Sequence, residues 1–300
     1  MSIYTGSGVA LCTPFDKNGN FNGAEYEKFI DFQVKQGTAA IVSCGTTGES
    51  TTLSNDEHIE VVRTAVLAAK KAGEKYGRKV PVIAGAGGNN TVACVATGKA
   101  LAQAGADALM YTAPYYNKTS QRGLVAHFTA IAAGVDVPVV VYNVPPRTAL
   151  NIQPKTLAEI AKLPNIQAVK ETSSDINQIA EVIERCASDM DIYVGNDSEI
   201  LPVLALGGKG VISTMGNIAP ATIQSIVDKF FAGDLEGCRK LQLSILPMTR
   251  LLFADVNPMP VKAALRMMGF DMGYCRLPLV DIEPVLAEEL LSEMKRFGLV

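Results

Sequence analysis

The chain has 300 residues, enough for one large core or for two ordinary domains. It carries 27 Lys and Arg against 30 Asp and Glu, and the resulting net charge of −3 argues against nucleic-acid binding, which needs a basic excess. No apolar run reaches the ~20 residues that cross a bilayer, and residues 1–15 lack the basic and apolar regions of a signal peptide. We therefore expect neither a membrane span nor a secretory leader.

The cysteine and histidine content narrows the class of protein further. The six cysteines are scattered without a C-x-x-C spacing, which predicts reduced thiols and a cytoplasmic protein. The two histidines, His58 and His127, lie far apart in the sequence. We therefore expect no bound metal and no Ser-His dyad.

Short apolar runs alternate with amphipathic stretches from residue 8 to residue 231. The apolar runs predict strands at 8–12, 39–43, 80–84, 108–112, 137–142, 166–172, 191–195 and 210–214. The amphipathic stretches predict helices at 24–36, 55–71, 91–103, 121–132, 154–163, 176–187, 199–206 and 219–231. Ser54 and Glu57 have the spacing of a capping box at the start of the second helix.

Eight strand–helix units in about 230 residues predict an α/β protein, a (β/α)8 TIM barrel over residues 1–232. Continuous apolar strands fit a sheet that is buried on both faces. A doubly wound open sheet is the alternative, but no G-x-G-x-x-G follows the first strand. After residue 232 only helices are predicted, at 235–253, 261–268 and 282–297, and they form a C-terminal three-helix appendage over 233–300.

Lys170 stands near the end of the sixth strand, where barrel enzymes place their active sites. Strand alternation puts it on one face with Ile166 and Ala168, and Tyr142 ends the fifth strand in the same way. An amine that is held out of water can be uncharged and attack a carbonyl carbon, so we interpret Lys170 as a Schiff-base residue. The alternative is a lysine that extends from the strand end into solvent.

The loop after the second strand is suited to a small carboxylate. Thr46 and Thr47 offer hydroxyl donors, and the flanking Gly45 and Gly48 let backbone N–H groups approach an anion. A plain strand-to-helix turn is the other interpretation of this loop. Gly195, at the end of the seventh strand, and the backbone near Ile212 in the eighth could also contact a ligand.

Six motifs, in this order and spacing along almost the whole chain, resemble those of the dihydrodipicolinate synthases, also called 4-hydroxy-tetrahydrodipicolinate synthases, a pyruvate-dependent class I aldolase family. The motifs are Gly45-Thr46-Thr47-Gly48-Glu49-Ser50, Pro114-Tyr115-Tyr116-Asn117, Tyr142-Asn143-Val144-Pro145-Pro146-Arg147-Thr148, Val169-Lys170-Glu171, Gly195-Asn196-Asp197 and Asn257-Pro258-Met259-Pro260-Val261-Lys262.

The resemblance implies that Lys170 forms a Schiff base with pyruvate, without any other cofactor, and that the enamine attacks L-aspartate-4-semialdehyde. Tyr142, Thr46 and Tyr116 would relay protons, with Tyr116 supplied by a neighbouring subunit of a homotetramer built as a dimer of dimers. Thr47 and the backbone near Ile212 would hold the pyruvate carboxylate.

Arg147 distinguishes between members of this aldolase group. Relatives that cleave N-acetylneuraminate or 2-keto-3-deoxy sugar acids share the lysine and the tyrosine but generally lack this arginine. Its two-pronged guanidinium suits the carboxylate of aspartate semialdehyde, so the synthase is favoured over these retro-aldolases. A non-catalytic barrel that binds a keto acid is the alternative from another class.

An effector site also follows from the resemblance. Lysine-inhibited synthases bind lysine through a histidine, an asparagine, a tyrosine and a glutamate, and His58, Asn89 and Tyr115 match the first three. Ala93 takes the place of the glutamate, and Asn55 replaces a second histidine. Because an anion is lost opposite a cationic ligand, we expect weak or absent inhibition by lysine.

Overall fold

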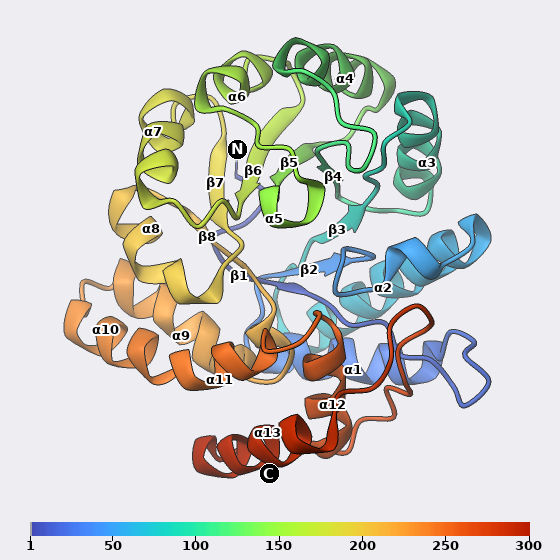
Figure 1. Cartoon of the computed structure of the whole chain (residues 1–300), viewed down its shortest axis with the longest axis vertical. Helices are drawn as coiled ribbons and strands as arrows, with labels where there is room; N and C mark the ends of the chain where they lie inside the picture. Colours follow the sequence, from blue (N-terminus) through green and yellow to red (C-terminus); the bar gives the residue numbers. More distant parts are fainter. Residues whose placement is uncertain (1) are drawn as a thin grey trace.

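The computed structural model describes residues 2–300, in which eight parallel strands form a closed barrel with neighbours in sequence order (Figure 1). The predicted (β/α)8 fold is confirmed. The strands are β1 Gly6–Ala10, β2 Ala40–Ser43, β3 Val82–Gly85, β4 Ala108–Thr112, β5 Val139–Asn143, β6 Ile166–Glu171, β7 Asp191–Val194 and β8 Gly210–Ser213.

Helices surround the barrel, and four more follow it (Figure 1). They are α1 Gly23–Lys35, α2 Asn55–Tyr76, α3 Thr91–Gln103, α4 Gln121–Gly134, α5 Pro145–Thr148, α6 Pro154–Ile160, α7 Ile176–Cys186, α8 Ile200–Leu206, α9 Pro220–Phe231, α10 Leu235–Ser244, α11 Leu246–Leu252, α12 Met259–Met267 and α13 Pro284–Phe297. Three 3-10 turns are η1 Ser50–Thr52, η2 Asp197–Glu199 and η3 Met215–Asn217. No helix within residues 2–300 is long and apolar enough to span a membrane.

Strand alternation creates two cores. In β5, Val140 and Tyr142 face the barrel interior, whereas Val139 and Val141 pack against the surrounding helices. The sequence placed Ile166 on the inner face with Ala168, and this is wrong: Ile166 lies in the outer core. The cause is a register shift, because Val139 pairs with Ile166 while the next residue of β5 pairs with Ala168. The extra residue in β6 turns the side chains that precede it in the strand to the opposite face of the sheet.

The capping box of α2 is confirmed, since Ser54 Oγ accepts from the Glu57 N–H at 3.2 Å and Glu57 accepts from the Ser54 N–H at 2.9 Å. The helix runs further than predicted, to Tyr76, where Gly77 ends it with a φ of 67°. Glycine tolerates this left-handed conformation at a helix C-terminus without a steric cost.

The segment predicted as one helix over 235–253 is two, α10 and α11, so residues 233–300 contain four helices and not three. Pro247 lies in the first turn of α11 and has no N–H to donate to the preceding turn, which explains the break. Figure 1 shows α10–α13 along one side of the barrel, near α9 and α1. The division at residue 232 stays a prediction.

Candidate active site

A cavity of about 390 Å³ opens at the carboxyl ends of the strands, the end at which (β/α)8 enzymes carry out their chemistry. Its lining includes Thr46, Thr47, Tyr142, Arg147, Lys170, Gly195, Thr214 and Asn257. A second cavity of about 280 Å³ shares Thr46, Tyr142 and Arg147 with the first and extends toward Tyr115. The structure therefore brings together most of the side chains that the sequence nominated.

Lys170 and Tyr142 form the inner wall of the larger cavity. The two residues are paired across β5 and β6, and Lys170 Nζ lies 4.4 Å from the centroid of the Tyr142 ring. Lys170 is 6% exposed, so the lysine does not extend into solvent. It takes part in none of the salt bridges found within residues 2–300. The Lys170 amine is therefore available to react with a ligand in the cavity, because no carboxylate within residues 2–300 pairs with it.

Gly195, directly after β7, lies against the side chain of Lys170. A methyl group at this position would lie 2.7 Å from Lys170 Cε and 2.1 Å from Thr172 Cγ2. Only a glycine leaves room for the lysine side chain in this path. The sequence assigned Gly195 to substrate contact, and the structure adds that it makes space for Lys170.

Asp197 organises the loop after β8. It accepts hydrogen bonds from the Ser213 hydroxyl and from the backbone N–H groups of Thr214, at 3.1 Å, and Met215, at 2.9 Å. Burial raises the pKa of Asp197, an effect that these donors and the charge of Lys170 partly offset. The carboxyl group thereby fixes the backbone at Thr214, which lines the cavity.

The loop after β2 is held in an uncommon conformation. Cys44 and Glu49 have φ values of 54° and 53°, a left-handed region that costs a non-glycine residue about 1–3 kcal/mol. Between them, Thr46 lines both cavities and Thr47 accepts a hydrogen bond from Asn257 Nδ2 at 2.9 Å. This conformation directs the two threonines toward the ligand space.

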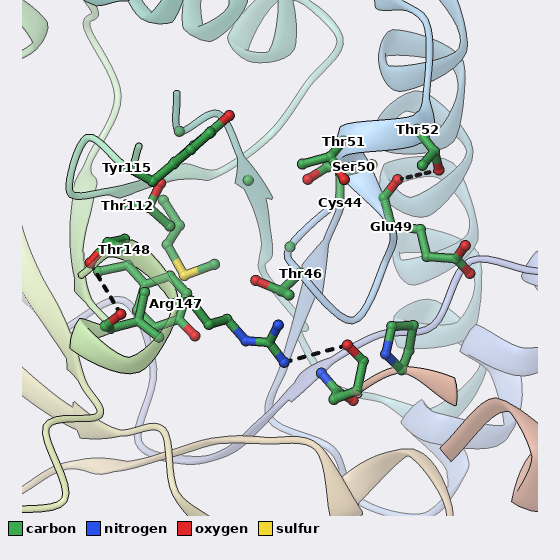
Figure 2. Close-up of a pocket in the computed structure, with 18 of the residues that line it drawn as sticks. Cys44, Thr46, Glu49, Ser50, Thr51, Thr52, Thr112, Tyr115, Arg147 and Thr148 are labelled. Atoms are coloured by element: carbon green, nitrogen blue, oxygen red, sulfur yellow. Dashed lines mark hydrogen bonds between the residues drawn. The ribbon is translucent and has the colours of Figure 1, made fainter. Parts of the chain in front are cut away.

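Arg147 stands at the rim on α5, the single turn of helix after β5. Figure 2 shows it reaching across the cavity toward the loop that carries Thr46. Its Nη2 donates to the Asn257 carbonyl at 3.4 Å. The rest of the guanidinium is available to a carboxylate, which it can bind through two parallel donors.

Behind the inner wall, Asn143 and Glu171 face the helices, and sequence reasoning did not find this pair. Asn143 Nδ2 donates to both carboxyl oxygens of Glu171, at 3.0 and 3.1 Å, and Ser173 N–H donates at 2.7 Å. Burial raises the pKa of Glu171, and these donors only partly offset it. The available signal was a polar residue directly after Tyr142 and another directly after Lys170.

Two of the residues nominated for catalysis or substrate binding do not line the larger cavity. Ile212 is fully buried in the inner core, and Thr214, directly after β8, is the neighbouring residue that lines the cavity. Tyr116 is 93% exposed, with a φ of 59°, and it is not among the residues that line either cavity. Its role in a proton relay therefore stays a prediction that depends on a second subunit.

The residues nominated for an effector line a third cavity of about 210 Å³, together with Asn55 and Ala93, and Tyr115 lines both this cavity and the one of 280 Å³. Asn89 Nδ2 donates to the Tyr115 carbonyl at 3.2 Å. Burial lowers the pKa of His58, whose Nε2 is buried and has no partner within residues 2–300. His58, Asn89 and Tyr115 thus share one pocket.

Fold and cavity together define a (β/α)8 barrel with a buried lysine at the carboxyl ends of its strands. The chain belongs to the dihydrodipicolinate synthetase family, whose model matches residues 4–296. It is therefore a lyase of the class I aldolase type.

Relatives agree in sequence and in structure. A protein named 4-hydroxy-tetrahydrodipicolinate synthase from Lachnoclostridium phytofermentans is 48% identical over 100% of both chains. A crystal structure of the synthase from Cyanidioschyzon merolae with lysine bound is 36% identical, covers 100% of both chains and has a TM-score of 0.95. The chloride-inhibited synthase from Acinetobacter baumannii, complexed with pyruvate, is 36% identical over 99% of both chains, with a TM-score of 0.94.

Proposed function

We propose that this chain is a 4-hydroxy-tetrahydrodipicolinate synthase, which condenses pyruvate with L-aspartate-4-semialdehyde in diaminopimelate and lysine biosynthesis. The observation that carries the proposal is Lys170, 6% exposed against the Tyr142 ring in a cavity with hydroxyl donors on one side and Arg147 at the rim. A relative of similar fold binds pyruvate, and this supports the choice of first substrate.

The first half of the reaction occurs on Lys170. Its Nζ attacks the ketone carbon of pyruvate, the carbinolamine loses water, and an iminium forms. Loss of a proton from C3 then gives the enamine. The Tyr142 and Thr46 hydroxyls border the cavity with Lys170 and can carry these protons without a fixed charge. Thr47 holds the pyruvate carboxylate, and this leaves the ketone facing the amine.

In the second half, the enamine carbon attacks the aldehyde carbon of aspartate semialdehyde, and the aldehyde oxygen takes a proton. The amino group of the new product then attacks the iminium carbon and displaces Lys170, which closes the ring and frees the enzyme. Arg147 at the rim binds the carboxylate of the second substrate. Glycine at 195 and the loop that Asp197 holds complete the walls of the cavity.

Trapping the first intermediate tests this proposal. Borohydride reduction in the presence of pyruvate should add the mass of pyruvate, less one water and plus two hydrogens, to the peptide that contains Lys170. Absence of the adduct, or an adduct on another lysine, would remove the basis of the mechanism. A non-catalytic keto-acid-binding barrel should also show no adduct.

A pair of assays separates the synthase from retro-aldolases of the same group. Turnover is measured with pyruvate and aspartate semialdehyde, and in parallel with N-acetylneuraminate or a 2-keto-3-deoxy sugar acid. We expect turnover in the first assay only, because Arg147 matches a carboxylate rather than a row of hydroxyls. Turnover of the sugar acid alone would overturn the assignment.

We further propose that lysine inhibits this enzyme weakly or not at all. His58, Asn89 and Tyr115 line one pocket, but Ala93 stands in it where a glutamate would oppose the ligand's ammonium group. The missing charge-assisted bond is worth roughly 1.5–3 kcal/mol. Half-inhibition at submillimolar lysine would contradict this, and Ala93→Glu should strengthen inhibition.

For assembly and location we propose a cytoplasmic homotetramer, a dimer of dimers in which Tyr116 enters a neighbour's site. Support comes from the exposed tyrosine with its left-handed backbone, and from six free cysteines in the described part of the chain. Sedimentation should give a tetramer. A Tyr116→Phe enzyme with undiminished turnover would argue against the relay.

A further inference from the structure

Asn257 contacts both groups that are proposed to bind substrate carboxylates, although it belongs to the C-terminal segment before α12. Its Nδ2 donates to Thr47 Oγ1 at 2.9 Å, and its carbonyl accepts from Arg147 Nη2 at 3.4 Å. The residue is 5% exposed and lines both cavities. The hydrogen bonds of Asn257 can therefore determine how Thr47 and Arg147 are oriented toward a ligand in the cavity.

The bond to Thr47 determines what the threonine hydroxyl can do. A hydroxyl has one proton to donate and two lone pairs to accept with. Asn257 Nδ2 donates to one lone pair of Thr47 Oγ1, and this oxygen has no other hydrogen bond within the described residues. The hydroxyl proton is therefore left for an acceptor in the cavity, and a carboxylate oxygen is such an acceptor.

A second contact from the same segment holds the loop itself. Lys262 on α12 donates to Glu49 Oε1 at 2.8 Å, and both side chains are buried, at 0% and 1% exposed. The other carboxyl oxygen of Glu49 accepts from the Arg276 N–H at 2.9 Å. Glu49 has the left-handed backbone described above, and such strain persists only where surrounding contacts enforce it. The C-terminal segment thus fixes the loop at Glu49 and the hydroxyl at Thr47.

We propose that Asn257 is a positioning residue that acts through Thr47: it turns the hydroxyl proton toward the carboxylate of pyruvate and so sets the affinity for the first substrate. This inference rests on the proposed function, because pyruvate is its ligand. The side chain of Asn257 serves Thr47, whereas only its backbone carbonyl meets Arg147. A change of the side chain should therefore affect pyruvate more than aspartate semialdehyde.

The test uses Asn257→Leu, which keeps the size of the side chain and removes the donor without adding a charge. We expect KM for pyruvate to rise about tenfold, the scale of one hydrogen bond to a charged ligand, with a smaller change in kcat and in KM for aspartate semialdehyde. In a Thr47→Val background the same substitution should raise KM for pyruvate no further, because the group through which Asn257 acts is gone.

Asn165→Leu is the matched control. Like Asn257, Asn165 donates through Nδ2, here to the carbonyls of Ala132 and Val135, and in both residues Oδ1 is buried without a partner within residues 2–300. Asn165 lies at the opposite end of the barrel, directly before β6. The Asn165→Leu substitution should lower the melting temperature and leave the KM values for pyruvate and for aspartate semialdehyde unchanged. A loss of folded enzyme lowers the apparent kcat and not KM, which separates damage from positioning.

The KM values for pyruvate in these variants decide whether Asn257 acts through Thr47. A KM for pyruvate within twofold of wild type in Asn257→Leu, or an equal rise in the Thr47→Val background, overturns the proposal. If Asn257→Leu does not fold, Asn257→Asp replaces it: aspartate can only accept, so it draws the Thr47 proton away from the cavity and should raise the same KM. Absence of a Lys170 adduct in wild type would instead reject the proposed function, whatever the Asn257 variants do.

Discussion

The two halves of the cavity are held in place by different means. The strand-borne half consists of Tyr142, Lys170 and Gly195, which lie at or just beyond the ends of β5, β6 and β7. The loop-borne half consists of Thr46, Thr47 and Arg147, which lie on segments that follow β2 and β5. Backbone pairing fixes the first half, whereas the second half is held by side chains and backbone groups of the C-terminal segment.

The difference shows in what lies behind each half. Behind the strands, Asn143 and Glu171 join neighbouring positions of one hydrogen-bonded sheet through an amide and a carboxyl group. Behind the loop, a buried ion pair joins Glu49 and Lys262, residues separated by 213 positions in the chain. The strand-borne half should therefore tolerate changes in the C-terminal segment, and the loop-borne half should not.

The largest effect is expected from Lys170→Ala. Loss of a covalent nucleophile should lower turnover by roughly 10⁴-fold or more and abolish borohydride trapping, with little loss of stability. Lys209→Ala, an exposed lysine at the other end of the barrel, should leave turnover unchanged. Substantial turnover by Lys170→Ala would show that the strand-borne half does not carry the chemistry.

Gly195→Ala tests how closely the strand-borne half is packed. The new methyl group would lie 2.7 Å from Lys170 Cε, so the lysine must move, and a misplacement near 1 Å costs about 10²-fold in rate. We expect kcat to fall by about that factor. At Gly23 a methyl group would lie 3.5 Å from Phe21 Cε1, an ordinary van der Waals distance, so Gly23→Ala should be neutral. Equal activity of the two variants would contradict the packing role.

Lys262→Met tests the ion pair behind the loop-borne half. Removing the cation leaves Glu49 buried and without its salt bridge, which should lower the free energy of unfolding by about 3–5 kcal/mol. Urea unfolding measures the change. The double variant Lys262→Met, Glu49→Gln should recover most of it, because no charge is then buried alone. A loss of less than about 1 kcal/mol in the single variant would show that the loop does not depend on this pair.

The smallest effect concerns pH and Glu171. Burial raises the pKa of this carboxyl in the folded state above the 4.5 of the unfolded chain, so the fold favours its protonated form. The stability that it contributes is complete below pH 4.5 and is lost as pH rises through the folded pKa. Relative to wild type, Glu171→Gln should therefore gain unfolding free energy as pH rises over this range. A difference that does not vary with pH would refute the prediction.

Much of the fold and part of the site could be predicted from the sequence, because the relevant signals are local. Apolar runs of strand length, alternating with helical periodicity, specify the eight units, and the position of Lys170 and Tyr142 at strand ends specifies the inner wall. The misplaced face of Ile166 shows the limit of such reasoning, since strand pairing decided the register shift.

The sequence by itself determined the barrel, the family and the lysine at its mouth. Only the tertiary structure decided which distant groups hold the loop: Asn257 on Thr47, Lys262 on Glu49, and Asp197 on the backbone after β8. Periodicity reports which face of an element is buried, but it carries no information about which polar groups meet across some 200 residues. Those pairings arise when the closed barrel and the C-terminal helices enclose them, since a buried polar group must find a partner wherever the fold places one.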